Sequence, residues 1–547
     1  MTHRNLPRPM KNASTAPASP LRPALRTPKQ RPSADLSALP RPIEPRPVVA
    51  CGLLMLVALA PRLALLPSNQ NLYGDAVIRT ELAGRWLANP HWISSFADGA
   101  FQFGPLHLYL LGLALKLWPA PELAGRVMSL VFGIATVVPL YLLTRRLFDW
   151  KAAVVACLAL SAWGMHIQFS TTAASESLAL FLVLCTLWLF AAGVEGGRFA
   201  PTAYSALMLN LACATRYDAW LLIPLLSGLL LFGDSDRIAA VTRAVFFGLL
   251  CLPFPLIWMQ GNEVALGSPF APIHHIEDFH RAWVGEELAL WGPFLYRLRN
   301  LFFWPGVALV TLSPLVALFG FAGMWSAWKQ QPLHRWLIWT ALIPTAYFTF
   351  RSAILLNFQP LGRFTANQLV LLLPYVSYGF QSFFGRGPSL WRRIVAVLSV
   401  ASAIGTPTFL GVLTSRDDDG IARSLAPIGP VSKNPAAVID LARFIKERAR
   451  ADGAGIILDT DPHHWDMQIA FFSGLPEEKM ARYRWDTFQK RLLTAQPAYL
   501  IRIDGGQLIE NLDFQLIGNR ARLGDRWFEE LPGFKPPFHV YRPLEPR

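Results

Sequence analysis

Long apolar segments separated by short polar turns dominate the chain between residues 48 and 412. The first of them, 48–66, is long enough to cross a bilayer as a helix, which takes about 20 apolar residues. The same pattern repeats along the chain and predicts about eleven transmembrane helices. The predicted spans are 48–66, 126–147, 152–169, 177–193, 201–214, 219–233, 244–260, 301–325, 336–350, 364–384 and 394–412.

The stretch that follows the first span, residues 73–87, has a different period. Its apolar residues Ile78, Leu82 and Trp86 recur every four positions, which is typical of an amphipathic helix. The segment is too polar to span a bilayer and apolar enough to lie on its surface. Asp75 stands where this helix begins, so its carboxylate is either held at the membrane surface or merely caps the helix.

Residues 103–119 are apolar but short for a span. If they dip into the interface without crossing, the pair Arg145-Arg146 falls on the cytoplasmic side. Loops rich in Lys and Arg favour that side, so we predict that this segment does not cross. With this choice every basic loop between spans is cytoplasmic, and the loops with isolated acids are external.

The two ends of the chain differ from its middle. Residues 1–47 are rich in Pro, Arg, Lys and Ser and predict a disordered cytoplasmic tail. After Thr414 the composition becomes that of a soluble domain, with helical periodicity over 436–450. Apolar runs at 456–459, 498–503 and 538–541 predict strands. The predicted organisation is a tail (1–47), a transmembrane domain (48–413) and an extracytoplasmic α/β domain (414–547).

Composition agrees with a multi-pass inner-membrane protein. Of the 547 residues, 53% are hydrophobic and only 16% are charged. The net charge of +14 is concentrated in the tail and the short loops, so it indicates the positive-inside rule and not nucleic-acid binding. The five cysteines lie in apolar segments without metal-binding spacing, so neither a disulfide framework nor a zinc site is predicted.

Several charged residues share the predicted external face. Asp75 and Glu176 each lie at the rim of a span, and Arg216 and Arg363 lie in external turns. Arginine binds phosphate oxygens in a fork, and a carboxylate can take a proton from a hydroxyl or amine. Such a face suits a substrate that is half lipid and half anion. The alternative is that these charges are ordinary interfacial anchors.

Two histidine-rich segments are candidate metal sites. The segment 272–280 contains His274, His275 and His280, but a helix would spread them over different faces. A helix lying over an acceptor pocket explains the segment better. The segment 461–466 is best explained as a turn at the end of a strand.

The order of these features resembles the GT-C fold glycosyltransferases, which use polyprenyl-phosphate-linked sugars. The similarity extends over about residues 48–385, and the nearest families are the bacterial protein O-mannosyltransferases and the lipid A aminoarabinose transferases. The matching motifs are Gly74-Asp75, Phe103-Gly104-Pro105-Leu106, Ala124-Gly125-Arg126-Val127-Met128-Ser129, Ser175-Glu176-Ser177-Leu178-Ala179-Leu180-Phe181 and Gly362-Arg363-Phe364-Thr365 leading to Leu373-Pro374.

The resemblance implies roles for these residues. Asp75 matches the catalytic acid that acts as base on the acceptor, and Glu176 matches a second external acid that holds a divalent metal in some members only. Arg363 matches a basic residue near the donor phosphate, and Arg216 is expected to share that task. Metal dependence stays open. Phe103 departs from the family pattern, because relatives often have a basic residue there.

The predicted function is therefore transfer of a sugar from a polyprenyl-phosphate donor to a lipid, glycan or protein acceptor on the extracytoplasmic face. The alternative is a transporter or flippase of lipid-linked saccharides. Transporters tend to carry charges at mid-membrane and to show inverted repeats. Here the ionisable residues avoid the centres of the spans, and the sequence shows no repeat. The sugar and the acceptor are not specified by the sequence.

Overall fold

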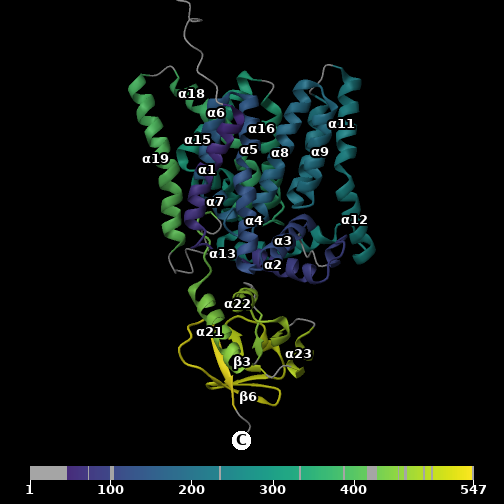
Figure 1. The fold of residues 1–547 in the computed structure, drawn as a ribbon, viewed down its shortest axis with the longest axis vertical. Helices are drawn as coiled ribbons and strands as arrows, with labels where there is room; N and C mark the ends of the chain where they lie inside the picture. The colour runs from purple at the N-terminus through teal and green to yellow at the C-terminus, as the bar shows by residue number, and fades with distance from the viewer. Residues whose placement is uncertain are drawn as a thin grey trace, which may run out of the picture. The chain divides into compact units, whose positions relative to one another are not determined.

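The computed structural model describes residues 46–544, apart from 72, 99–103, 233–235, 332–333, 386–387, 416–427, 454, 461–464, 484–486 and 495–496. All but the last two residues of the predicted tail, and the 461–464 part of the predicted turn, lie outside the described residues. The helical part and the C-terminal sheet domain follow one another along the chain (Figure 1).

Most of the described chain is helical. The helices before the C-terminal domain are α1 (Pro47–Leu65), α2 (Tyr73–Ala88), α3 (Pro105–Leu117), α4 (Pro121–Ala135), α5 (Val137–Leu147), α6 (Trp150–Ala162), α7 (Gly164–Phe169), α8 (Ser175–Gly196), α9 (Phe199–Cys213), α10 (Leu222–Leu230), α11 (Arg237–Cys251), α12 (Pro253–Leu266), α13 (Ala271–Leu301), α14 (Phe303–Thr311), α15 (Pro314–Gln330), α16 (Arg335–Thr349), α17 (Ala366–Leu369), α18 (Val376–Phe384) and α19 (Ser389–Thr414).

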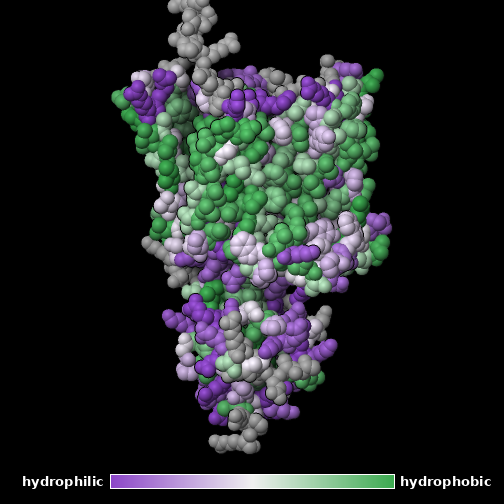
Figure 2. Space-filling model, in the orientation of Figure 1, coloured by the Kyte–Doolittle hydropathy of each residue, from purple (hydrophilic) through white to green (hydrophobic). Residues whose placement is uncertain are grey.

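On the face shown in Figure 2, an apolar belt covers the helical part between two more polar ends. Within the described residues, four helical stretches are long and apolar enough to cross a membrane: Pro47–Leu65, Pro121–Leu147, Ser175–Val194 and Ser389–Thr414. A fifth arises if α11 and α12, which are bent by 44° at their junction, form one span. The structure thus supports a multi-pass membrane protein, while the count of eleven spans stays a prediction.

Several predicted spans are interrupted in the structure. The predicted span 301–325 is divided between α14 and α15, because Ser313 has a φ of 78° and Pro314 cannot continue the hydrogen-bond ladder. The predicted span 364–384 consists of short helical pieces, among them η7 (Val370–Tyr375), which contains Pro374. Proline removes one backbone donor in each case, and the apolar pattern alone does not register that loss.

Residues 261–301, which follow the predicted span 244–260, are largely helical. α12 continues to Leu266, and α13 fills most of the remainder, with a kink at Gly292 where φ is 71°. Its buried side chains include His280 and Val284, which lie one turn apart before the kink, and Tyr296 after it. α13 includes the histidine-rich segment 272–280, for which a helix was the favoured interpretation.

The C-terminal domain contains one seven-stranded sheet in the order β2-β1-β3-β7-β6-β5-β4. β1 pairs in parallel with β2 and β3, and the remaining pairs are antiparallel. Alternate residues of β1 face two separate cores: Ile456 and Leu458 pack with α21, and Ile457 packs on the opposite side. The elements of this domain are α21 (Ala436–Asp452), β1 (Gly455–Leu458), α22 (Trp465–Ser473), β2 (Met480–Arg482), α23 (Phe488–Thr494), β3 (Pro497–Ile503), β4 (Phe514–Ile517), β5 (Arg520–Leu523), β6 (Arg526–Glu530) and β7 (Phe538–Pro543).

Helix α2 covers the predicted segment 73–87 and extends one residue beyond it, and α3 packs beside it (Figure 1). The 13 residues of α3 make it shorter than a span, as expected for the segment that was predicted not to cross. α2 also packs against α22, so it lies between the helical part and the sheet domain.

Candidate active site

Asp75, in the first turn of α2, forms an ion pair with Arg363, which lies in the short turn η6 (Gly362–Thr365). Oδ2 of Asp75 and Nη1 of Arg363 are 2.5 Å apart, and the two side chains are only 21% and 20% exposed. Hydrogen bonds between ionised partners are stronger than neutral ones. The fold therefore holds the predicted base and the predicted phosphate ligand directly against each other.

A second ion pair joins Glu176 to Arg216. Glu176 lies in the first turn of α8, where the helix dipole stabilises a carboxylate, and Arg216 precedes the turn η3 (Tyr217–Leu221). Nη1 of Arg216 is 2.8 Å from Oε1 of Glu176, and its Nε is 3.0 Å from Oδ1 of Asp218. Arg216 therefore already has two carboxylate partners.

One narrow crevice is lined by both members of the second pair and by Arg363 of the first, whose partner Asp75 lies beside it. Asn367, on α17, donates from Nδ2 to Oδ2 of Asp218 at 2.7 Å and so connects the second pair to the segment that carries Arg363. All four site residues predicted from the sequence are thus brought together. The crevice is lined by Glu176, Ala179, Leu180, Arg216, Asp218, Arg363, Ala366 and Asn367.

Arg79 belongs to this cluster and was not singled out by the sequence. It follows Asp75 by four positions on α2, so both residues lie on the same face of the helix. The side chain of Arg79 is buried. Burial lowers its pKa, which the nearby carboxylates of Asp75 and Glu176 oppose. The four-residue spacing was the available signal, but it becomes informative only once the buried face of α2 is known.

The carboxylate of Asp75 is held in its ionised form. Burial alone raises its pKa, but the positive charges of Arg363 and Arg79 outweigh burial and lower the pKa to about 2. Because the folded-state pKa is depressed, the carboxylate is charged at neutral pH. It can therefore accept a proton, and a change at either arginine alters its basicity.

The residues at the crevice fit a divalent cation poorly. Each carboxylate already contacts a guanidinium, so a metal ion would have to displace an arginine and stand beside the others. Among the described residues, no group of three His, Cys, Asp or Glu side chains is arranged to hold a metal ion. The acids are Asp75, Glu176 and Asp218, and the guanidiniums facing them are Arg79, Arg216 and Arg363.

The histidines of 272–280 lie on α13 and diverge, as their spacing predicted. His280 is buried; its ring stacks on Phe358 at 4.6 Å, and its Nδ1 accepts a hydrogen bond from the backbone N of Gln359. His274 and His275 are exposed. On the same helix Glu277 pairs with Arg351 at 2.7 Å. These contacts fasten α13 to the segment that leads to Arg363.

Gly104 allows α3 to approach the turn that carries Arg216. A Cβ atom at this position would lie 2.2 Å from the carbonyl oxygen of Ala214, well inside van der Waals contact. The backbone N of Leu106 donates to the same oxygen at 3.0 Å. Glycine is therefore required for the close packing of α3 against this turn.

The chain is similar to one protein family in part of its sequence and to several solved structures in its fold. The family described as dolichyl-phosphate-mannose-protein mannosyltransferase matches residues 102–258. No curated protein sequence matches the chain. The structure of ArnT from Cupriavidus metallidurans bound to undecaprenyl phosphate is similar over 90% of this chain and 97% of its own, with a TM-score of 0.57 at 13% identity.

The oligosaccharyltransferase of Archaeoglobus fulgidus is a second structural neighbour. Its complex with zinc and sulfate is similar over 83% of this chain and 68% of its own, with a TM-score of 0.55 at 14% identity. Its complex with an inhibitory peptide and a dolichol-phosphate matches over 84% and 69%, with a TM-score of 0.51 at 14% identity. These similarities confirm the resemblance to GT-C fold proteins and the helical architecture with a C-terminal sheet domain.

Proposed function

We propose that this chain is a membrane glycosyltransferase that moves a sugar from a polyprenyl-phosphate donor to an acceptor on the extracytoplasmic face. The family match and the shared fold support this function. Among the structural neighbours, ArnT binds undecaprenyl phosphate and the archaeal oligosaccharyltransferase binds dolichol-phosphate together with a peptide. A lipid-linked sugar and an acceptor are the corresponding substrates here.

The observation that carries the proposal is the Asp75–Arg363 ion pair beside the Glu176–Arg216 pair. Sugar transfer from a lipid phosphate needs a base for the acceptor and cations for the leaving phosphate. Asp75 supplies the first, and the arginines that line the crevice supply the second. Ordinary interfacial anchors have no need to be buried and paired in this way.

In the proposed reaction Asp75 takes the proton from the acceptor hydroxyl or amine. The acceptor oxygen or nitrogen attacks the anomeric carbon, and the bond from that carbon to the phosphate oxygen breaks. The polyprenyl phosphate leaves with the electron pair, and its charge is stabilised by arginine. Attack opposite the leaving group inverts the configuration at the anomeric carbon.

Arg363 links the two halves of this reaction. Its Nη1 contacts Asp75, while its Nε is buried and has no hydrogen-bond partner among the described residues. A buried donor without a partner is costly, and a phosphate oxygen would satisfy it. A phosphate that shares Arg363 also weakens its hold on Asp75, so donor binding makes Asp75 a stronger base.

Arg216 is a weaker candidate for the donor phosphate, although it was predicted to share that task. Its two carboxylate partners, Glu176 and Asp218, neutralise much of its charge. We assign Arg216 to the support of Glu176 and place Glu176 at the second side of the crevice, where it orients the acceptor. No metal is required for either role.

The proposal includes the topology that the sequence predicted: about eleven spans, a cytoplasmic N-terminus and an extracytoplasmic C-terminal domain, with boundaries at residues 47 and 413. α19 ends at Thr414, which supports the second boundary. The segment before α2 is hydrogen-bonded to residues that lead into the C-terminal domain, for example Gln70 to Ser432. The crevice and the sheet domain therefore share one side of the membrane.

The test is a transfer assay with purified full-length protein and a panel of radiolabelled polyprenyl-phosphate sugars, with membrane extracts as the source of acceptors. We expect one donor to lose its sugar to an acceptor in an enzyme-dependent way. Movement of an intact donor across vesicles, without cleavage of its sugar–phosphate bond, would instead identify a flippase.

A further inference from the structure

The break between α1 and α2 is tied to the segment that enters the C-terminal domain. Nδ2 of Asn69 donates to the carbonyl of Pro430 at 3.1 Å, and Oδ1 of Asn69 accepts from the backbone N of Ser432 at 2.9 Å. Oε1 of Gln70 accepts from the backbone N of Asn434 at 2.9 Å. Asn69 and its partners are buried, so water does not compete for these bonds.

The same break also contacts the turn before Glu176. Nδ2 of Asn69 donates to Oγ1 of Thr171 at 2.6 Å, and Oδ1 of Asn71 accepts from the backbone N of Ala173 at 2.9 Å. Nδ2 of Asn434 donates to the carbonyl of Asn71 at 2.8 Å. The segment entering the sheet domain is therefore linked to the residues just before Asp75 and, through them, to the turn just before Glu176.

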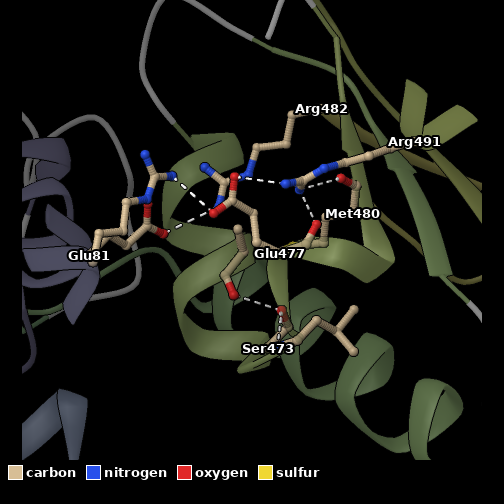
Figure 3. A network of polar contacts seen from close by, with 9 residues as sticks. Glu81, Ser473, Glu477, Met480, Arg482 and Arg491 are labelled. Atoms are coloured by element: carbon tan, nitrogen blue, oxygen red, sulfur yellow. Dashed lines mark hydrogen bonds and ion pairs between the residues drawn. The ribbon is translucent and has the colours of Figure 1, made fainter. Parts of the chain in front are cut away.

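A second attachment lies further along α2 (Figure 3). Nη2 of Arg482, at the end of β2, is 3.2 Å from Oε1 of Glu81, and the Arg482 side chain is 4% exposed. Arg85 pairs with Glu477 at 3.4 Å, and Glu477 also pairs with Arg491 at 3.0 Å. Through these contacts α2 is held by the C-terminal domain on the turns that follow Asp75.

We propose that the C-terminal domain positions the base. Arg482 contacts Glu81, and the 430–434 segment contacts residues 69–71. Together these contacts fix the position of α2 and therefore of Asp75. A buried ion pair adds little net stability, because desolvation offsets the attraction, but it imposes one geometry. Glu81 and Arg482 are positioning residues in this scheme, since neither touches the crevice. The inference rests on the proposed function.

Positioning errors are costly in catalysis. A displacement of about 1 Å between reacting groups lowers the rate by about a hundredfold. Breaking the Glu81–Arg482 pair leaves Arg363 and the crevice intact, so donor binding should not change. The expected signature is a fall in kcat of about tenfold or more at an unchanged donor KM.

The experiment compares Glu81→Arg, Arg482→Glu and the double exchange in the full-length protein. We expect each single variant to lose kcat and the double exchange to regain most of it, because the pair is restored with its charges reversed. Glu529→Arg is the matched control: Glu529 is 29% exposed, against 21% for Glu81, and it pairs with Arg542 within the sheet domain. The control should keep the kcat of the wild type.

Hydrogen exchange of α2 provides a readout that does not depend on the reaction. Residues 73–88 should exchange faster in both single variants and return towards the wild-type rate in the double exchange. If the wild type transfers no sugar, the proposed function fails, and the exchange data still test the attachment. Unchanged kcat in both single variants, at wild-type yield of folded protein, would overturn the positioning role.

Discussion

Asp75 and Arg363 form an ion pair of 2.5 Å between the start of an interfacial helix and a turn late in the helical part of the chain. The pair places the candidate base within reach of the candidate phosphate ligand. Each group then controls the other: the arginine keeps the carboxylate ionised, and the carboxylate leaves one guanidinium face for a phosphate.

Replacing Asp75 with asparagine should abolish transfer while the protein still folds. Asparagine keeps the size of the side chain but cannot accept the acceptor's proton, and general-base catalysis contributes about 10²–10⁴-fold. Initial rates of sugar transfer by purified protein give the answer, with thermal unfolding as the check on folding. Asp278→Asn is the matched control, because Asp278 is exposed on α13 and pairs only locally with Arg281. Wild-type rates in Asp75→Asn would mean that Asp75 serves only the helix terminus.

Replacing Arg363 should weaken donor binding, and the loss should be larger when the substitute carries no positive charge. Losing one charge-assisted phosphate contact costs about 1.5–3 kcal/mol, which corresponds to about a tenfold to hundredfold rise in the half-saturating donor concentration. Lysine keeps the charge but not the fork, so Arg363→Lys should be less affected than Arg363→Ala. Donor titrations at saturating acceptor measure the effect, with Arg281→Ala as a surface control. If the half-saturating donor concentration were unchanged in Arg363→Ala, this arginine would be only an interfacial anchor.

The same pair predicts a pH dependence. Burial raises the pKa of Asp75, but Arg363 and Arg79 bring it down to about 2. The stability that the ionised carboxylate contributes is therefore present above its unfolded-state pKa of 3.8 and is lost only as the pH falls through about 2. From about pH 7 to about pH 5, protonation of Asp75 should not slow the wild type. Arg363→Gln should raise the pKa of Asp75 and shift the acid limb of the pH–rate profile to higher pH. If the acid limbs of the variant and the wild type coincide, Arg363 does not lower the pKa of Asp75.

The sequence predicted the elements whose apolar residues recur at a regular spacing or form a continuous run. α2 was predicted from Ile78, Leu82 and Trp86, and β1, β3 and β7 were predicted from apolar runs. β5 and β6 were missed because most of their residues are polar, and β4 was missed because its apolar residues form only a very short run.

The sequence named four residues that the structure brings together, but it did not indicate which arginine pairs with which acid. The topology placed Asp75, Glu176, Arg216 and Arg363 on one face, because each stands beside an apolar span. Which arginine meets which acid depends on how distant segments pack, and that information is not local. Arg79 was missed because its approach to the crevice depends on which face of α2 is buried.

The membrane topology can be tested without reference to the reaction. Alkaline phosphatase is active only outside the cytoplasm, so a fusion after Thr414 should be active and a fusion after Arg146 inactive. The physical basis is the bias of basic loops, such as that containing Arg145 and Arg146, towards the cytoplasm. Immunoblots of both fusions control for expression. The reverse pattern would place the crevice on the cytoplasmic side and remove the proposed donor.

Gly104 should be intolerant of even a methyl group. A Cβ atom there would lie 2.2 Å from the oxygen and 2.6 Å from the carbon of the Ala214 carbonyl, and these backbone atoms cannot move without shifting Arg216. We expect Gly104→Ala to lose about 1–3 kcal/mol of stability, as overpacked sites do. Transfer should fall with it, since Arg216 supports Glu176.

Thermal unfolding and initial rates of the purified Gly104→Ala protein measure both effects. Gly52→Ala is the matched control, because a Cβ at Gly52 on α1 would have nothing within 4 Å. The control should unfold and transfer as the wild type does. If Gly104→Ala behaved like this control, the close approach of α3 to the Arg216 turn would have no part in shaping the crevice.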